Sequence, residues 1–284
     1  MSVASKGYAV PDVLVDADWA EQHRKDSKIK LVEVDVDTNA YNEGHIPGAI
    51  AWNWTSQLND PLRRDIPSAE DLQKLLGQSG ISNDDTILLY GDNNNWFAAF
   101  AFWILKLYGH QDVRLIDGGR KKWVLDNREL TTQEEHPTPA TYEVKSLDLT
   151  YRSTVLDILG AIKTGAISLV DVRSPAEFTG EVIAPPGMTE TAQRGGHIPS
   201  AKSVPWSTTV NEDGTFKDAA ALKELYAAKG VDTGKPLVAY CRIGERSSHT
   251  WFVLHYLLGH KDVKNYDGSW TEYGSMVGVP IEKP

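Results

Sequence analysis

Short runs of apolar residues recur along the chain and predict buried β-strands. Each run is flanked by polar or turn-forming residues, and each is too short to be a helix of ordinary length. In both halves of the chain, longer segments with helical patterning separate the runs. The predicted strands cover residues 30–34, 86–90, 113–116, 167–172, 236–240 and 263–266.

The segments between these strands carry helix start signals. Ser68 precedes the acidic residues Glu70 and Asp71 and then a leucine-rich stretch, which is the pattern of a capped helix N-terminus. Residues 218–228 fill the same place in the second half, and residues 247–258 have helical length and composition. Strands separated by helices need crossover connections, so we expect an α/β fold with a largely parallel sheet in each half, flanked by helices.

The chain repeats itself, which predicts two homologous domains. The first half contains Leu31-Val-Glu-Val-Asp35 and Gly44-His-Ile-Pro-Gly-Ala49, and both return in the second half. We place the first domain at residues 1–140 and the second at 141–284, joined by a polar linker around residues 127–149. The matching segments are Leu169-Val-Asp-Val-Arg173 and Gly196-His-Ile-Pro-Ser-Ala201, followed by pairs 150 positions apart: Tyr90 and Tyr240, His110 and His260, Asp117 and Asp267.

The charge balance narrows the choice of partners. The 284 residues carry a formal net charge of −10, without a basic tract, which argues against nucleic acid or an anionic membrane as a partner. No apolar run reaches the roughly 18 residues that a membrane span needs. The first residues have no apolar segment of the kind found in secretory signals, so we expect a cytoplasmic protein.

Cys241 is the only cysteine. The chain therefore forms no internal disulfide and has no second thiol to resolve an oxidised Cys241. Zinc sites that need two or four cysteines are excluded, and the eight histidines lack the spacings typical of paired metal ligands. We expect neither a metal nor a cofactor.

The loop Cys241-Arg-Ile-Gly-Glu-Arg246 lies between a predicted strand and a predicted helix. Parallel sheets place ligands at this kind of junction, beyond the carboxyl end of a strand. Backbone N–H groups of Ile243, Gly244 and Glu245 are expected to converge there as an anion-binding nest, with Gly244 allowing the curl. With the charges of Arg242 and Arg246 added, we expect a lowered pKa for Cys241 and a nucleophilic thiolate.

The matching loop in the first half lacks this chemistry. Tyr90 leads into Gly91-Asp-Asn-Asn-Asn-Trp96, which has the same length but no thiol and no arginine. Asp92 stands where Arg242 stands and should disfavour anions. The first domain is thus predicted to be catalytically inert.

Over nearly its whole length the sequence resembles the two-domain thiosulfate sulfurtransferases, the rhodaneses, in particular a bacterial branch with a Cys-Arg-Ile-Gly-Glu-Arg loop. The resemblance rests on that loop and on three motifs: Asp171-Val-Arg-Ser-Pro-Ala-Glu-Phe178, Gly196-His-Ile-Pro-Ser-Ala201 and Asn265-Tyr-Asp-Gly-Ser-Trp270. It implies an inactive first domain and a persulfide on Cys241. Sulfur would pass from thiosulfate to cyanide or a thiol, with Arg242 and Arg246 binding the anion.

The resemblance also bears on residues outside the cysteine loop. Arg194 is a candidate substrate contact, because related mercaptopyruvate enzymes have an arginine nearby. A substrate arginine of vertebrate-type enzymes is replaced here by Glu177. Asp171 and Arg173 are expected to brace loops. His45 and His197 occupy matching positions in the repeated Gly-His-Ile-Pro motif, and both are expected to be structural. Glu245 is expected to be solvated or paired with an arginine.

Several alternatives stay open at this point. A 3-mercaptopyruvate sulfurtransferase usually has a less charged loop than this one, and a persulfide carrier without catalysis would keep the same cysteine. A phosphatase of similar fold separates its cysteine and arginine by five residues, whereas four lie between Cys241 and Arg246. Arg242 favours thiosulfate as the donor because it adds a charge partner for the dianion.

Overall fold

The computed structural model describes residues 2–184 and 191–284, which form two compact units. Each unit takes most of one sequence half and a short segment of the other. The first unit contains residues 1–6, 11–148 and 210–216, and the second contains residues 7–10, 149–209 and 217–284.

The first unit is built on a parallel sheet with the strand order β1-β5-β4-β2-β3. Its central strands are largely buried, and Leu31, Leu88 and Ile116 from these strands share a core with Trp123. The strands are β1 (Leu14–Val15), β2 (Ile29–Glu33), β3 (Ala49–Ala51), β4 (Thr86–Tyr90) and β5 (Val113–Ile116).

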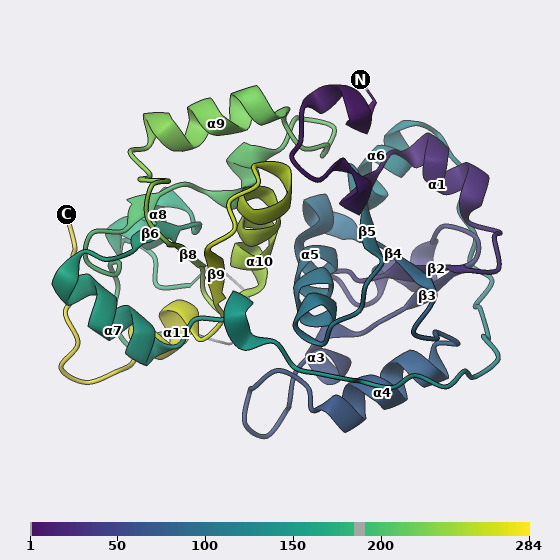
Figure 1. The fold of residues 1–284 in the computed structure, drawn as a ribbon, viewed down its shortest axis with the longest axis horizontal. Helices are drawn as coiled ribbons and strands as arrows, with labels where there is room; N and C mark the ends of the chain where they lie inside the picture. The colour runs from purple at the N-terminus through teal and green to yellow at the C-terminus, as the bar shows by residue number, and fades with distance from the viewer. Residues whose placement is uncertain (1, 185–190) are drawn as a thin grey trace. The chain divides into compact units, whose positions relative to one another are not determined.

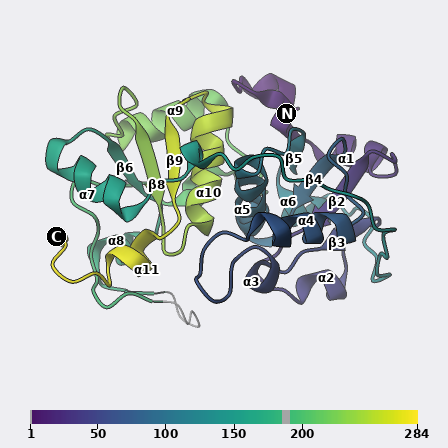
Figure 2. The ribbon, with the colours of Figure 1, turned by 60° about the horizontal axis from the view of Figure 1, so that its bottom comes forward.

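The second unit repeats this design with the order β7-β6-β8-β9, again all parallel. In Figure 2 the strands β6, β8 and β9 lie side by side. Tyr240 and Tyr266, at the ends of two strands, belong to the buried core of this unit together with Trp270. The strands are β6 (Ser168–Asp171), β7 (Lys202–Ser203), β8 (Leu237–Tyr240) and β9 (Val263–Tyr266).

Helices and 3-10 turns connect the strands in both units. In the second unit α10 packs against β8 and β9, as Figure 1 shows, and so fixes the loop that precedes it. The first unit has η1 (Val3–Lys6), η2 (Pro11–Val13), α1 (Ala17–His23), α2 (Ala40–Glu43), α3 (Trp54–Gln57), α4 (Ala69–Gln78), α5 (Asp92–Leu107) and α6 (Gly119–Leu125). The second has η3 (Leu149–Tyr151), α7 (Val155–Thr164), α8 (Pro175–Thr179), η4 (Trp206–Thr209), α9 (Ala219–Ala228), α10 (Glu245–Phe252), the π-helical turn η5 (Val253–Leu257) and α11 (Ser269–Tyr273).

The α/β fold with two tandem units and parallel sheets is confirmed. Ser68 caps α4 by accepting a hydrogen bond from the backbone N–H of Asp71, and Asp218 caps α9 in the same way. The short strands β1, β3 and β7 were not predicted. Two or three residues are too few to show a hydrophobic period, so such strands are recognised only by their pairing.

The predicted linker at residues 127–149 has almost no regular secondary structure but packs against the first unit. Thr131 pairs with His45, and Tyr142 contacts the ring of His110 through its hydroxyl group. At the far end the Asp148 N–H donates to the carbonyl of Leu107. Each of these contacts satisfies a polar group of a buried residue of the first unit, so this stretch follows that unit as far as residue 148.

In each unit, a buried aspartate directly after the last strand binds a segment that is distant in the sequence. In the first unit Asp117 forms an ion pair with Lys6 and accepts a hydrogen bond from the N–H of Phe216, which holds the segment 210–216. In the second unit Asp267 forms a bidentate ion pair with Arg152. The aspartates repeat in sequence, but their partners come from unrelated positions.

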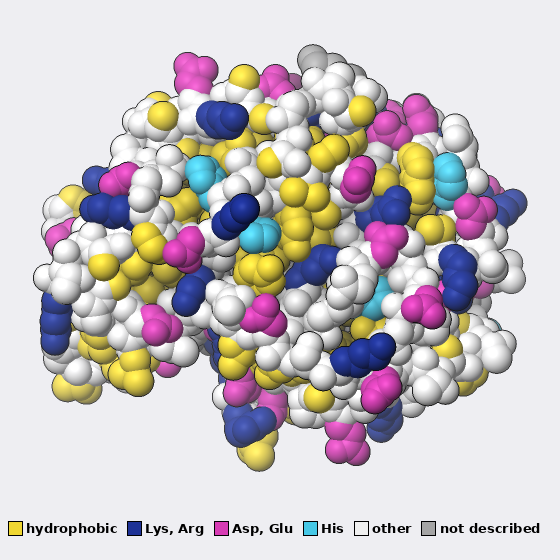
Figure 3. All heavy atoms as spheres, viewed as in Figure 1, with side chains coloured by type: hydrophobic (Ala, Val, Ile, Leu, Met, Phe, Trp, Pro, Cys, Tyr) yellow, Lys and Arg dark blue, Asp and Glu magenta, His cyan; other side chains and the backbone are white. Residues whose placement is uncertain are grey.

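Charged side chains of both signs are interspersed on the face shown in Figure 3. None of the helices in the described part of the chain is long and apolar enough to cross a membrane.

Candidate active site

Cys241 lies directly after β8, where the chain curls toward α10. Its side chain is fully buried. The N–H of Gly244 donates a hydrogen bond to Sγ, with N and Sγ 3.1 Å apart. The predicted loop geometry is thus present for one donor, and it directs a backbone dipole at the sulfur atom.

Glycine is required at position 244 for two reasons. Its φ is +96°, a left-handed conformation that side chains disfavour. A Cβ atom there would lie 2.6 Å from Cα of Asp267, far inside van der Waals contact. The N–H that faces Sγ therefore depends on the absence of a side chain.

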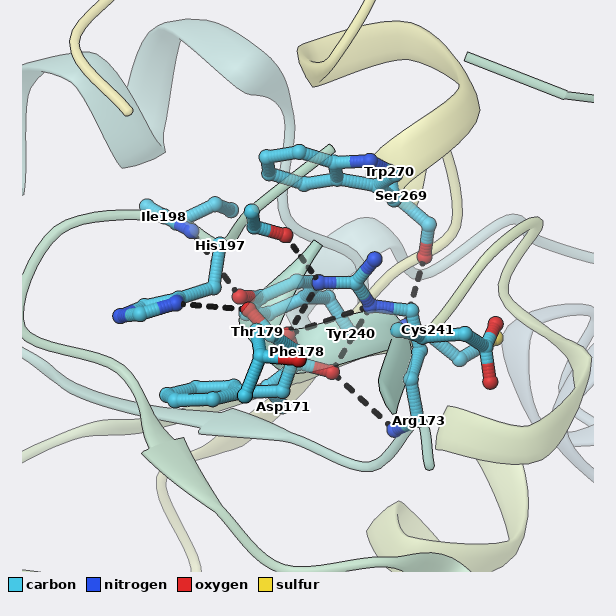
Figure 4. Close-up of polar contacts among 12 residues, drawn as sticks. Asp171, Arg173, Phe178, Thr179, His197, Ile198, Tyr240, Cys241, Ser269 and Trp270 are labelled. Carbon is cyan, nitrogen blue, oxygen red and sulfur yellow. Dashed lines mark hydrogen bonds and ion pairs between the residues drawn. The ribbon is translucent and has the colours of Figure 1, made fainter. Parts of the chain in front are cut away.

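The segment that follows β9 fixes the main chain of the loop. The N–H of Cys241 donates to Oγ of Ser269 over 3.0 Å, as Figure 4 shows. In return, the N–H groups of Trp270 and Thr271 donate to the carbonyls of Cys241 and Arg242. The cysteine backbone is thus held on both sides by the start of α11.

The other two predicted N–H donors have different surroundings. The N–H of Ile243 donates to Oε2 of Glu245, not to the sulfur. Glu245 contributes its carboxylate instead: the Cys241 thiol donates to the same Oε2, with Sγ and Oε2 3.2 Å apart. Glu245 was expected to be solvated or paired with an arginine. It is only 1% exposed, and Oε1 lies 3.8 Å from Arg242 and 3.9 Å from Arg246, so the pairing agrees with the structure and the solvation does not.

The expectation of a lowered pKa for Cys241 is wrong, because its surroundings raise the pKa of the thiol. Burial raises the pKa of Cys241, and the neighbouring Glu245 carboxylate raises it further. Arg246 and hydrogen bonds from Ser247 act in the opposite direction but do not compensate. The sequence showed the arginines, but not that a carboxylate would point at the sulfur.

Arg246 is already paired with another residue. Its two terminal nitrogens donate to the two carboxylate oxygens of Glu177, each over 2.9 Å, and both side chains are buried. Burial alone would raise the pKa of Glu177, but the hydrogen bonds and charge of Arg246 outweigh it and lower the pKa to about 2. Arg242 is also buried, with Nη2 3.8 Å from Oε1 of Glu245.

Arg194 binds backbone, not the cysteine loop. Its guanidinium nitrogens donate to the carbonyls of Gly274, Met276 and Val279, and its own carbonyl accepts from the indole N–H of Trp270. These contacts fasten the C-terminal segment beside α11. Arg194 thus has a structural setting, and its contact with substrate stays a prediction.

A buried stack of side chains supports the carboxyl ends of β6 and β8 (Figure 4). Arg173 forms a bidentate ion pair with Asp171 and donates to the carbonyl of Gly196. Its guanidinium lies over the ring of Trp270, 4.5 Å from the centroid. The expected bracing role of Asp171 and Arg173 agrees with this geometry. His197 has the structural setting expected of it, with its ring stacked on Phe178 and Nδ1 against the carbonyl of that residue.

Polar groups that sequence reasoning missed lie beneath the loop. The amide nitrogen of Asn265 donates to the Gly244 carbonyl over 2.9 Å, and Ser248 Oγ donates to the same carbonyl over 2.7 Å. Ser247 Oγ donates to the Asn265 amide oxygen. All three side chains are buried. Together they fix the carbonyl of Gly244, the residue whose N–H faces Sγ.

The repeat provides the signal that could have revealed this network. At the positions 150 residues earlier, the first half has Phe97, Ala98 and Leu115 in place of Ser247, Ser248 and Asn265, all buried and apolar. Ser269, at φ +52°, replaces Gly119, which has the same φ. The fold is thus compatible with hydrocarbon at these sites, and the polar residues serve the cysteine loop.

Asn265→Leu, which copies the first half, should lower the free energy of unfolding by about 2 kcal/mol, because Ser247, Ser248 and the Gly244 carbonyl each lose a buried hydrogen bond. Urea unfolding followed by circular dichroism measures this. The exposed Asn42, changed to leucine, serves as the control and should shift stability by under about 0.5 kcal/mol. Equal effects of the two changes would contradict a supporting role for Asn265.

The matching loop in the first unit is built differently. Asn93, Asn94 and Asn95 all have left-handed φ values, and the Asp92 carboxylate accepts the N–H groups that follow β2. A Cβ at Gly91 would lie 2.1 Å from the carbonyl oxygen of Val34, so a cysteine does not fit there. The first unit is thus without a nucleophile and without space for one at this position.

No cluster of histidine, cysteine and carboxylate side chains suited to a metal ion occurs in residues 2–184 and 191–284.

Comparisons with known proteins agree with this organisation. The rhodanese-like domain matches residues 16–126 and 154–276. A putative thiosulfate sulfurtransferase of Saccharopolyspora erythraea is 58% identical over 96% of this chain and 97% of its own length. The sulfur carrier protein TtuD of Thermus thermophilus is 53% identical over 98% and 99%. Among solved structures, the 3-mercaptopyruvate sulfotransferase SseA of Escherichia coli is 28% identical with a TM-score of 0.78, over 91% of this chain and 98% of its own.

Both halves match the same domain, and the identities extend over nearly the whole length of each relative. This chain therefore belongs to the rhodanese family and carries two tandem rhodanese-like domains.

Proposed function

We propose that this protein is a thiosulfate sulfurtransferase that carries sulfur as a persulfide on Cys241. The Cys241 thiolate attacks the outer sulfur of thiosulfate, sulfite leaves, and a thiol or cyanide then removes the bound sulfur. The observation that carries the proposal is the hydrogen bond from the Gly244 N–H to Sγ, because the same dipole stabilises a thiolate or persulfide anion.

The side chains of the loop fit this reaction. Arg242 follows the nucleophile directly and supplies a charge for a doubly negative donor. Arg246 contributes less than its formal charge, since Glu177 already binds it. A single cysteine is sufficient, because the acceptor removes the sulfur and no resolving thiol in the protein is needed.

The similarity to putative thiosulfate sulfurtransferases supports this reading, and two other relatives define its alternatives. One relative is named as a sulfur carrier, and a solved relative as an enzyme of 3-mercaptopyruvate. A carrier would load sulfur but would not turn over with a small acceptor. A mercaptopyruvate enzyme would prefer a donor with a carboxylate and less charge near the transferred sulfur.

Side-by-side turnover with thiosulfate and 3-mercaptopyruvate, with cyanide as the acceptor, tests the proposal. We expect wild type to use thiosulfate more efficiently. Arg242→Gly should reduce kcat/KM for thiosulfate by about tenfold more than for mercaptopyruvate, because the dianion loses a charged partner. An equal fall for both donors would mean that Arg242 shapes the loop instead. Sulfur loading without turnover would identify a carrier.

A further inference from the structure

The contact between Cys241 and Glu245 places an acid and a base of the same loop within proton-transfer distance. The thiol donates to Oε2 of Glu245 over 3.2 Å. The N–H of Ile243 holds that oxygen in place, also over 3.2 Å. Both residues are buried, so bulk water is not the nearest proton acceptor of the thiol.

Glu245 faces two arginines through its second carboxylate oxygen. Its other oxygen, Oε1, lies 3.8 Å from Nη2 of Arg242 and 3.9 Å from Nε of Arg246. Within the described residues Oε1 accepts no hydrogen bond. From α8, Glu177 faces the same arginine and binds it through two hydrogen bonds. Of these two carboxylates, Glu177 has a bidentate ion pair with an arginine and Glu245 does not.

The first half shows which residue occupies the position of Glu245 when no cysteine is present. Asn95 is the residue 150 positions before Glu245, and its amide oxygen accepts the N–H of Gly91 over 3.1 Å. A neutral amide therefore completes the loop where no thiol is present. The ionisable group occurs only in the half that holds the nucleophile.

We infer that Glu245 is the base that takes the proton of Cys241 during sulfur transfer. This inference rests on the function proposed above. When thiosulfate binds, the thiol proton moves to Oε2 of Glu245, and the resulting thiolate attacks the outer sulfur of the donor. A bond forms between Sγ and that sulfur, and the bond between the two sulfur atoms of thiosulfate breaks.

The electron pair of the broken bond leaves on sulfite, which takes the proton from Glu245 and departs as hydrogen sulfite. Glu245 is again a carboxylate, and Cys241 holds an anionic persulfide. Attack by cyanide then releases thiocyanate and the Cys241 thiolate, which regains a proton from solvent.

Glu245→Gln tests this assignment because it keeps the size and the acceptor for the Ile243 N–H but loses the base. Sulfur loading from thiosulfate is followed by intact mass in rapid-quench samples from pH 6 to pH 10. At pH 7 we expect loading to slow by about 100-fold. The deficit should shrink toward pH 10, where the thiol ionises without help. Glu224→Gln, an exposed glutamate of α9, is the control and should load like wild type.

The opposite outcome has a clear signature. If Glu245 acted only through its charge, glutamine would lower the pKa of the thiol and make loading faster at pH 7. A rate equal to or above that of wild type would overturn the inference while leaving the proposed function intact. Failure of wild type to take up any sulfur would instead overturn the proposed function.

A second variant decides the matter if Glu245→Gln does not fold. Glu245→Asp keeps the carboxylate but is one methylene shorter, which moves it away from Sγ. Loading should fall at least about tenfold at pH 7 and recover with rising pH. Loading at the wild-type rate across the whole pH range would overturn the assignment.

Discussion

Cys241→Ser is expected to abolish sulfur transfer completely, down to the uncatalysed background. Cys241 is the only thiol in the chain, so no other side chain replaces it as the sulfur carrier. A serine hydroxyl ionises far less readily than a thiol and forms no persulfide. Intact mass after thiosulfate treatment should show one added sulfur atom on wild type and none on the variant.

The fold should survive this change, because serine fits the volume and the backbone contacts remain. The N–H of residue 241 still has Ser269 as its partner, and its carbonyl still accepts from Trp270. A thermal unfolding curve close to that of wild type is the control that separates lost chemistry from lost structure. Sulfur uptake by the serine variant, or unchanged thiocyanate release, would exclude Cys241 as the nucleophile.

The fold could be predicted from the repeat, because each main strand is indicated by an apolar run in both halves of the chain. The strands that include Tyr90 and Tyr240 were found from their apolar runs and from the matching residues that follow each of them. Edge strands such as Lys202–Ser203 could not be found this way, since their identity lies in pairing with a distant strand. The predicted domain boundary also differs from the structure, where contacts of residues 141–148 assign them to the first unit.

The site could be predicted only in part. The position of Cys241 and the hydrogen bond from Gly244 follow from the strand–loop–helix order and from the glycine. The direction of each charged side chain does not follow from spacing. Glu177 lies 64 positions before Cys241 in the chain, yet it reaches Arg246, whereas Glu245 turns back toward the sulfur. These two carboxylates decide the charge of the loop, and only the folded chain brings them together.

The ion pair between Glu177 and Arg246 holds the start of α8 against the start of α10. Glu177 also stabilises its own helix, because Ser174 and Glu177 form a reciprocal capping box at the α8 N-terminus. One carboxylate thus serves a helix cap and the active loop together. Its loss removes both supports and leaves the guanidinium of Arg246 buried without its bidentate partner.

Glu177→Gln should therefore destabilise the protein by about 3 kcal/mol at pH 7, since removing one partner of a buried pair exposes the cost of the other charge. Because the pKa of Glu177 is lowered to about 2, its contribution is complete above the ordinary glutamate pKa of about 4.3 and is lost as the pH falls through about 2. The stability difference between wild type and variant should be constant from pH 7 to about pH 5 and shrink below pH 4. Urea unfolding at each pH measures it, with the exposed Glu224→Gln on α9 as the control. A difference that does not shrink in acid would show that the glutamine acts through packing and not through the lost charge.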